Sequence, residues 1–173
     1  DLSGKKTNKI AYRKKGEEYK IKINNTKISK ISQLIGKFPS IVLSPEDTDI
    51  VSGGNSARLT YINKILSVSS KEYLKTLTHY NKIIKIRNRC LSVNKDYSEI
   101  VVWDEQLNPL AIKIWEHREK FFNEFNNEFQ LLWTKVMPSK HSTVQYKSPE
   151  EVYRKKLVET LFKRIEKDKY RGQ

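Results

Sequence analysis

The sequence has a single cysteine, Cys90, and its three histidines show no metal-binding spacing. One thiol excludes an internal disulfide, and a four-ligand zinc cluster would have to be built mainly from histidines and carboxylates. No apolar run approaches the roughly 20 residues of a membrane span, and no signal peptide is visible. We therefore expect a cytoplasmic, soluble protein without a metal site.

Basic residues are abundant and spread along the whole chain. Lysine and arginine number 34 against 20 acidic residues, which gives a net charge of +14. Such an excess favours a polyanionic partner, although lysine-rich helices can also simply be well solvated. The length of 173 residues suits one domain or one lobe of a larger protein, and the start at Asp1 without methionine favours a segment of a longer chain.

The first 43 residues combine strand and helix patterns. Alternating apolar residues from Tyr19 to Ile23 predict a half-buried strand, paired with residues 10–12 through a turn at Gly16. The apolar spacing over 28–35 predicts a short helix ending at Gly36. The run 38–43 is typical of a buried strand.

From Ser44 onward the apolar residues follow a helical period. We predict helices over 59–66 and 73–91, the second opened by Ser70, and a helix of about 45 Å over 107–137, with 94–106 as the link. A last helix is expected over 149–167. The fold class is therefore α+β and mostly α, with a small antiparallel β edge (1–43) followed by an elongated helical hairpin or bundle (44–173).

The tetrapeptide Ser-Pro-Glu-Asp at 44–47 nearly recurs as Ser-Pro-Glu-Glu at 148–151. Both obey the rules for starting a helix, with a serine cap, proline in the first turn and acidic residues at the positive helix end. The first copy is followed closely by Ser-Gly-Gly at 52–54 and by Arg58. That order would place backbone amides and Arg58 at a sheet edge, where ligands often bind.

The run "SPEDTDIVSGGNSARLTYIN" resembles a motif of the RecF family, recombination-repair proteins with an ABC-type ATPase head related to SMC proteins. The family pattern departs at Asn55 and Leu59 and is matched by ten residues: Pro45, Glu46, Asp47, Ile50, Val51, Gly53, Arg58, Tyr61, Ile62 and Asn63. Further matches are Arg87, Asn88, Trp103, Asp104 and Arg118. The resemblance extends from about Ile10 onward.

The resemblance implies that the chain is the middle portion of a RecF protein, an edge of the head plus an inserted helical lobe. The parent protein would bind ATP and Mg as a slow ABC-type ATPase, dimerise head to head, and bind single-stranded or gapped DNA. With RecO and RecR it would help load RecA at gaps, in DNA replication, repair, recombination and the SOS response. The chain has no GxxxxGK[ST] loop and no Walker B strand, so by itself we expect no cofactor and no catalytic residues.

Two groups of residues are candidate sites. The resemblance implies that the loop with Arg58 faces the nucleotide of the parent protein; its other members are Ser44, Pro45, Glu46 and Asp47. A capping turn that only fixes local geometry is the alternative.

Cations spaced along the predicted helix 73–91 form the candidate DNA-contacting group: Lys75, Lys82, Lys85, Arg87 and Arg89. We expect contacts to phosphates with little base preference, or else a solvated helix face. The competing function classes are a module that docks RecR or a second RecF head, and an unrelated basic helical nucleic-acid-binding domain. The aromatic residues from Trp115 to Trp133 have helical spacing, which favours a packed core over base stacking.

Overall fold

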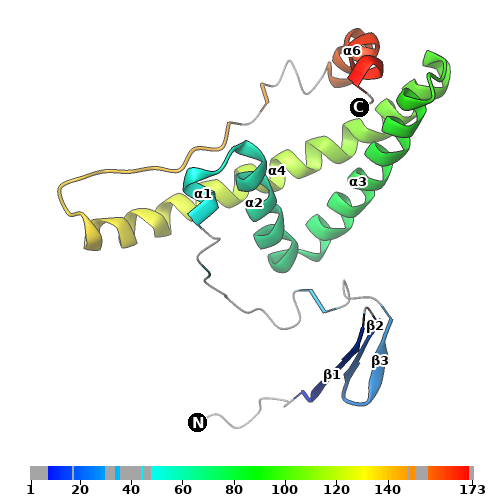
Figure 1. The fold of residues 1–173 in the computed structure, drawn as a ribbon. Coiled ribbons are helices and arrows are strands. Elements are labelled where there is room, and N and C mark those ends of the chain that lie inside the picture. The colour runs from blue at the N-terminus through cyan, green and yellow to red at the C-terminus, as the bar shows by residue number, and fades with distance from the viewer. Residues whose placement is uncertain are drawn as a thin grey trace. The chain divides into compact units, whose positions relative to one another are not determined.

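The computed structural model describes residues 8–16, 18–29, 34–35, 44, 48–147, 149–150 and 156–171. The chain forms two compact units, Asp1–Leu43 and Ser44–Gln173 (Figure 1). The assignment of the first unit to the edge of an ATPase head stays a prediction.

The first unit contains a three-stranded antiparallel sheet in the order β1-β2-β3. Its strands are β1 (Ile10–Lys15), β2 (Glu18–Ile23) and β3 (Thr26–Ile28). The predicted hairpin of β1 and β2 is confirmed, with Gly16 at a φ of 60° in the turn. Tyr12 and Ile28 both lie opposite Ile21, which is the buried residue of the sheet.

The prediction of a helix beginning at Ile28 is wrong, because this residue lies in β3. Asn24 and Asn25 both adopt positive φ, 47° and 67°, which is the backbone of a two-residue hairpin turn. The chain therefore turns back as a third strand. In the rest of the predicted helix, Ser29 is a bend and residues 34–35 form a turn. Residues 30–33, Gly36 and the predicted strand 38–43 lie outside the described residues.

The described residues of the second unit form helices α1 (Asp49–Ser52), α2 (Asn55–Ser69), α3 (Lys71–Ser92), α4 (Tyr97–Val136) and α6 (Leu157–Arg171) (Figure 1). Helices α3 and α4 form an antiparallel hairpin, which confirms the mostly helical α+β class. Ser70 caps α3 as predicted, since its Oγ accepts a hydrogen bond from the Tyr73 amide at 3.1 Å.

Helix α4 begins ten residues earlier than predicted. Ile100 and Asp104 continue the buried face of Leu107, Ala111 and Ile114, so the residues predicted as a link are the first turns of the helix. The connection to α3 is reduced to 93–96, where Asn94 adopts a φ of 53°.

Two apolar clusters hold the helices together. One consists of Leu66, Tyr73 and Ile114, from α2, α3 and α4. The other consists of Leu91, Ile100 and Ile165, from α3, α4 and α6. The hairpin therefore packs against α2 at one place and against α6 at another.

Helix α6 starts later than the prediction of 149–167. Residues 149–150 are not helical, while the predicted Ser148 cap lies outside the described residues. Leu157 and Ile165 are buried and form the inner face of the helix.

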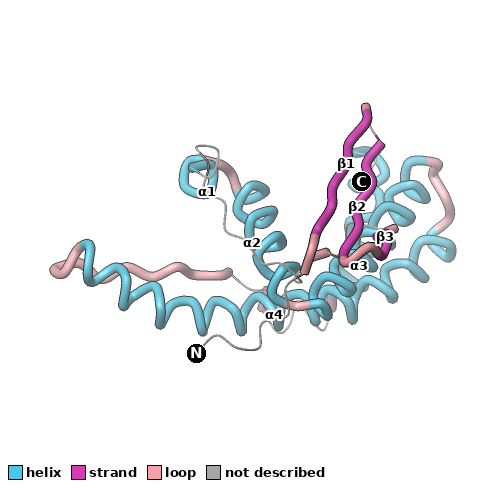
Figure 2. Tube along the Cα trace, turned by 90° about the horizontal axis from the view of Figure 1, so that it is seen from below, coloured by secondary structure: helices cyan, strands magenta, loops and turns pink. Residues whose placement is uncertain are grey.

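Residues 138–147, here called the strap, return along the distal half of α4 without forming a helix (Figure 2). The Asn126 side chain fixes the strap by donating to the Val144 carbonyl at 2.8 Å and accepting from the Val144 amide at 2.9 Å. The Trp133 indole also donates to the Lys140 carbonyl at 2.8 Å. These contacts satisfy strap backbone groups that have no helix or sheet partner.

We predict that Ile100→Ala destabilises the fold by roughly 2–5 kcal/mol, because it leaves a cavity between α3, α4 and α6. Ile100 is fully buried, whereas its neighbour Val102 is 48% exposed. Val102→Ala is therefore the control and should change the free energy of unfolding by about 0.5 kcal/mol or less. Urea denaturation of both variants measures the difference, and equal losses would contradict the packing described.

Candidate functional site

Arg58 lies at the corner between α1 and α2, where it holds the end of α1. Its Nη1 donates to the Gly53 carbonyl at 2.9 Å. A Cβ at Gly53 would overlap the carbonyl oxygen of Asp49, so the tight turn requires glycine. The contacts of Arg58 described here are thus local, and they give this corner a defined geometry.

Of the other members of the predicted nucleotide-facing loop, the structure describes one. Ser44 is described and has a contact partner. Pro45, Glu46 and Asp47 lie outside the described residues. The role of this loop toward a nucleotide stays a prediction.

Four of the five predicted DNA-contacting cations are exposed on one face of α3: Lys75, Lys82, Lys85 and Arg89. Their spacing of seven, three and four residues keeps them within one stripe of a helix. We call these four residues the α3 stripe.

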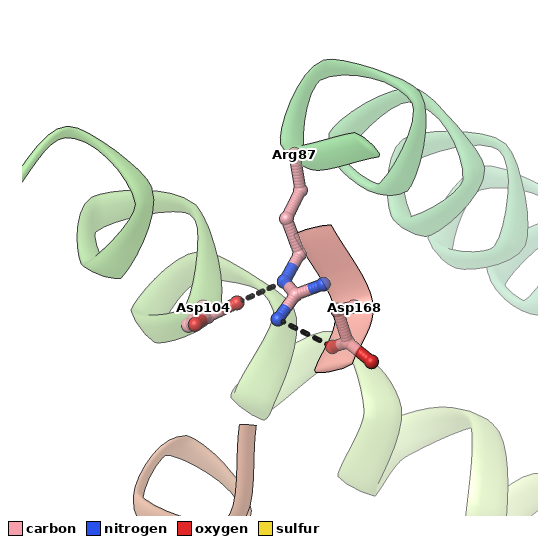
Figure 3. Close-up of polar contacts among 3 residues, drawn as sticks. All are labelled: Arg87, Asp104 and Asp168. Carbon is pink, nitrogen blue, oxygen red and sulfur yellow. Dashed lines mark hydrogen bonds and ion pairs between the residues drawn. The ribbon is translucent and has the colours of Figure 1, made fainter. Parts of the chain in front are cut away.

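Arg87 does not belong to this stripe, which corrects the prediction. Only 5% of the residue is exposed, and it points between helices α4 and α6 (Figure 3). Its Nε donates to Asp104 Oδ1 at 2.5 Å, and its Nη2 donates to Asp168 Oδ2 at 3.2 Å. A buried guanidinium requires such partners, so Arg87 binds three helices together instead of facing solvent.

The sequence carried a signal for this burial. Arg87 lies four residues after Ile83 and four before Leu91, and both of these are buried. A charge in the inward register of a helix indicates a buried ion pair. The partners could not be found the same way, because Asp168 lies 81 residues further along the chain.

Asp104 is fully buried, and this burial raises the pKa of its carboxyl group. The hydrogen bond and the charge of Arg87 act in the opposite direction, while the nearby Asp168 raises the pKa further. Arg87 therefore limits the rise in the pKa of Asp104 that burial causes.

A second polar network joins α2, α3, α4 and the strap around Arg118. The guanidinium donates to Asn63 Oδ1 at 2.8 Å, to the Tyr73 hydroxyl at 3.2 Å and to the Tyr146 hydroxyl at 3.3 Å. The Tyr73 hydroxyl also donates to Asn63 Oδ1 at 2.6 Å. Asn63 and Arg118 each match the family pattern in the sequence, but no spacing rule joins residues 55 apart.

Burial affects the two central groups of this network differently. It raises the pKa of the Tyr73 hydroxyl, with the Arg118 charge opposing it. Burial lowers the pKa of Arg118, but hydrogen bonds and electrostatic interactions with Tyr146 and Tyr73 together outweigh it and leave the pKa raised. Arg118 therefore stays charged among neutral oxygens.

Within the described residues, no three histidine, cysteine or acidic side chains come together as a metal site. No helix in that same part of the chain is long and apolar enough to cross a membrane.

Two solved structures share this fold. Their titles describe the recombination mediator protein RecF, with ATPrS or with ATP, in the RecFOR pathway. The TM-scores are 0.82 and 0.80 at 25% identity, over 96% of this chain and 48% of the solved chain in each case. The fold is therefore that of a large part of a recombination mediator protein.

Curated relatives carry the name DNA replication and repair protein RecF. The chain is 34% identical to that of Thermoanaerobacter sp. (strain X514) over 170 residues, which is 90% of this chain and 46% of the relative. It is 31% identical to that of Leptospira interrogans serogroup Icterohaemorrhagiae serovar Lai over 150 residues, which is 86% of this chain and 41% of the relative. No protein-family model matches the chain. The chain belongs to the RecF family and spans about half the length of these relatives.

We predict that Arg87→Met costs about 3–5 kcal/mol of stability at pH 7, because it leaves Asp104 buried without its cation. Without Arg87 the folded-state pKa of Asp104 lies still further above its unfolded value, so the folded chain binds the proton more tightly. Stability of the variant should therefore rise as the pH falls from 8 toward 4, and the gap to the wild type should narrow.

Urea denaturation across this pH range measures the effect. Arg89→Met is the matched control, since Arg89 is exposed and its loss should change stability little at any pH. A gap between Arg87→Met and the wild type that stays constant with pH would contradict the role assigned to Asp104.

Proposed function

We propose that this chain supplies the helical lobe of a cytoplasmic RecF protein that binds DNA and binds ATP with Mg. The complete protein would work with RecO, RecR and a second RecF head to load RecA at single-strand gaps. The family membership and the RecF structures titled with ATP and with the RecFOR pathway support this proposal. ATP would act as a switch for dimerisation and DNA affinity, with slow hydrolysis.

The observation that carries the DNA role is the α3 stripe. Its four cations share one exposed face, while the buried residues of α3, among them Tyr73 and Leu91, face the other helices. Among the residues that the structure describes, no cation of the α3 stripe forms an ion pair, whereas Arg87 forms two. Such a row suits a phosphate backbone and would bind DNA with little sequence preference.

Docking of a protein partner is the second candidate. The distal end of α4 exposes three apolar residues, Leu131 (61%), Leu132 (61%) and Val136 (75%). An exposed group of this kind is typical of a contact with another protein, such as RecR or a second RecF head. In that case DNA would bind elsewhere in the parent protein.

For the nucleotide switch, we propose that residues 44–47 and Arg58 face the ATP of the parent protein. The defined corner of α1 and α2 supports this, because the bond from Arg58 to the Gly53 carbonyl would couple a shift of α1 to α2. A purely structural cap remains the alternative.

We predict that the double variant Lys82→Glu/Lys85→Glu weakens binding to labelled gapped DNA and flattens its salt dependence. Loss of two phosphate contacts should reduce the slope of log K against log salt by about 2. The control is Lys135→Glu/Lys140→Glu, which makes the same charge change at exposed positions outside α3. A salt titration compares the two, and an equal loss in both would refute the stripe. Failure of the wild-type chain to bind gapped DNA at low salt would favour docking.

We predict that Glu46→Gln/Asp47→Asn in the full-length parent impairs ATP-dependent dimerisation without lowering its melting temperature. Analytical ultracentrifugation with and without ATP measures the monomer–dimer equilibrium. Glu150→Gln serves as the control, because it removes a carboxylate from the second Ser-Pro-Glu tetrapeptide. Unchanged dimerisation would leave residues 44–47 as a local cap.

A further inference from the structure

A cleft of about 850 Å³ opens within the helical unit, between α2, α4 and the strap. Most of its wall is aliphatic or aromatic, and the cations in the wall come from three different segments. The apolar wall includes Leu59, Ile62 and Phe125, and the cations are Arg58, Arg118 and Lys147. The cleft contains no residue of the α3 stripe, and it shares one residue, Arg58, with the proposed nucleotide-facing loop.

The charges of the cleft have one sign only. Among the residues that the structure describes, its lining contains these three cations and no carboxylate. An apolar cleft with one-sided cationic charge is complementary to a ligand that is apolar and carries a negative charge.

Arg118 is the cation most strongly placed to bind this ligand. Its described hydrogen bonds go to Asn63 and to the hydroxyls of Tyr73 and Tyr146, which are all neutral acceptors. The buried Arg87, in contrast, forms ion pairs with two carboxylates. The charge of Arg118 is therefore satisfied in hydrogen bonds but not neutralised, and an incoming carboxylate would gain from it.

The ring geometry of the cleft disfavours a nucleobase. Phe121 and Phe125 stack on each other at 5.6 Å, and Phe122 stacks on Tyr146 at 5.6 Å with an angle of 7°. One face of each of these four rings is thus already occupied by a neighbouring ring, which leaves less aromatic surface to sandwich a base. Aliphatic side chains such as Leu59 and Ile62 instead suit the side chain of a peptide.

We propose that this cleft binds a segment of a partner protein that presents a leucine- or phenylalanine-sized side chain next to a carboxylate. The apolar side chain lies against Leu59, Ile62 and Phe125, and the carboxylate binds Arg118. Three supports come together at one place: the volume of the cleft, its apolar wall and its uncompensated cation.

Asn63 offers a sharp test of this proposal. Its Oδ1 accepts hydrogen bonds from both Arg118 and Tyr73. Aspartate in this place has nearly the same shape and can accept both bonds, but it would neutralise the guanidinium. Asn63→Asp should therefore keep the fold and remove the attraction for a carboxylate.

The experiment titrates the chain with the peptide acetyl-Gly-Asp-Phe-Gly-amide and with its neutral counterpart acetyl-Gly-Asn-Phe-Gly-amide. Methyl NMR signals of Ile62 in the cleft report binding, and those of Ile83, buried in α3, report an intact fold. We expect the acidic peptide to bind at least tenfold more tightly than the neutral one. Asn63→Asp should abolish that difference, and Asn127→Asp, the same change at an exposed position of α4, should preserve it.

Several outcomes would overturn the proposal. Equal affinity for the two peptides would remove the role of Arg118, and no shift at Ile62 would remove the peptide site. If Asn127→Asp abolished the difference between the peptides as Asn63→Asp does, the preference for the acidic peptide would reflect only the net charge of the chain. Tighter binding of thymidine monophosphate than of the acidic peptide, with the shifts at Ile62, would assign the cleft to a nucleotide.

Discussion

The length difference between α3 and α4 governs the helical unit. With 40 residues, α4 extends about 60 Å, whereas the 22 residues of α3 extend about 33 Å. One partner of this length cannot cover all of α4. Helix α2 and the strap therefore supply further contacts, and apolar residues such as Leu131 near the far end remain exposed. The cleft exists because α4 is covered by separate segments and not by one continuous helix.

Two arginines with limited exposure are accommodated in opposite ways. Arg87 lies between two carboxylates, and this arrangement determines which residues of α4 and α6 can lie against α3. Arg118 lies among an amide and two hydroxyls, so its hydrogen bonds are satisfied while its charge is retained. The first arrangement suits a fixed structural contact and the second suits recognition of an anion.

Local patterns predicted the elements that depend on local physics. The alternation around Ile21 predicts the hairpin, and Ser70 predicts the start of α3. Both signals can be recognised because periodicity and capping depend only on residues close together in the sequence. The start of α4 was missed because 100–103 is a run of four consecutive apolar residues, which hides the helical period. For β3 and the turn before it, the paired asparagines are the sequence signal of a hairpin turn. This signal is weaker than the apolar spacing that follows it, which favours a helix.

The polar sites show a different limit. The exposed cations of α3 follow from spacing on one helix, so the sequence could place Lys82 and Lys85 on one face. The charge of Arg87 suggests the same face, but its register with the buried Ile83 and Leu91 is inward. The pairing of Arg118 with Asn63 joins segments far apart in the chain, and a single sequence contains no rule for such contacts.

The hydrogen bonds between Asn126 and the strap also affect the rate of amide hydrogen exchange. The Val144 amide proton is bound to a side chain of α4 and not to a neighbouring backbone carbonyl. Its exchange with solvent deuterium would then be governed by detachment of the strap rather than by fraying of α4. One backbone proton thus reports how often the wall of the cleft opens.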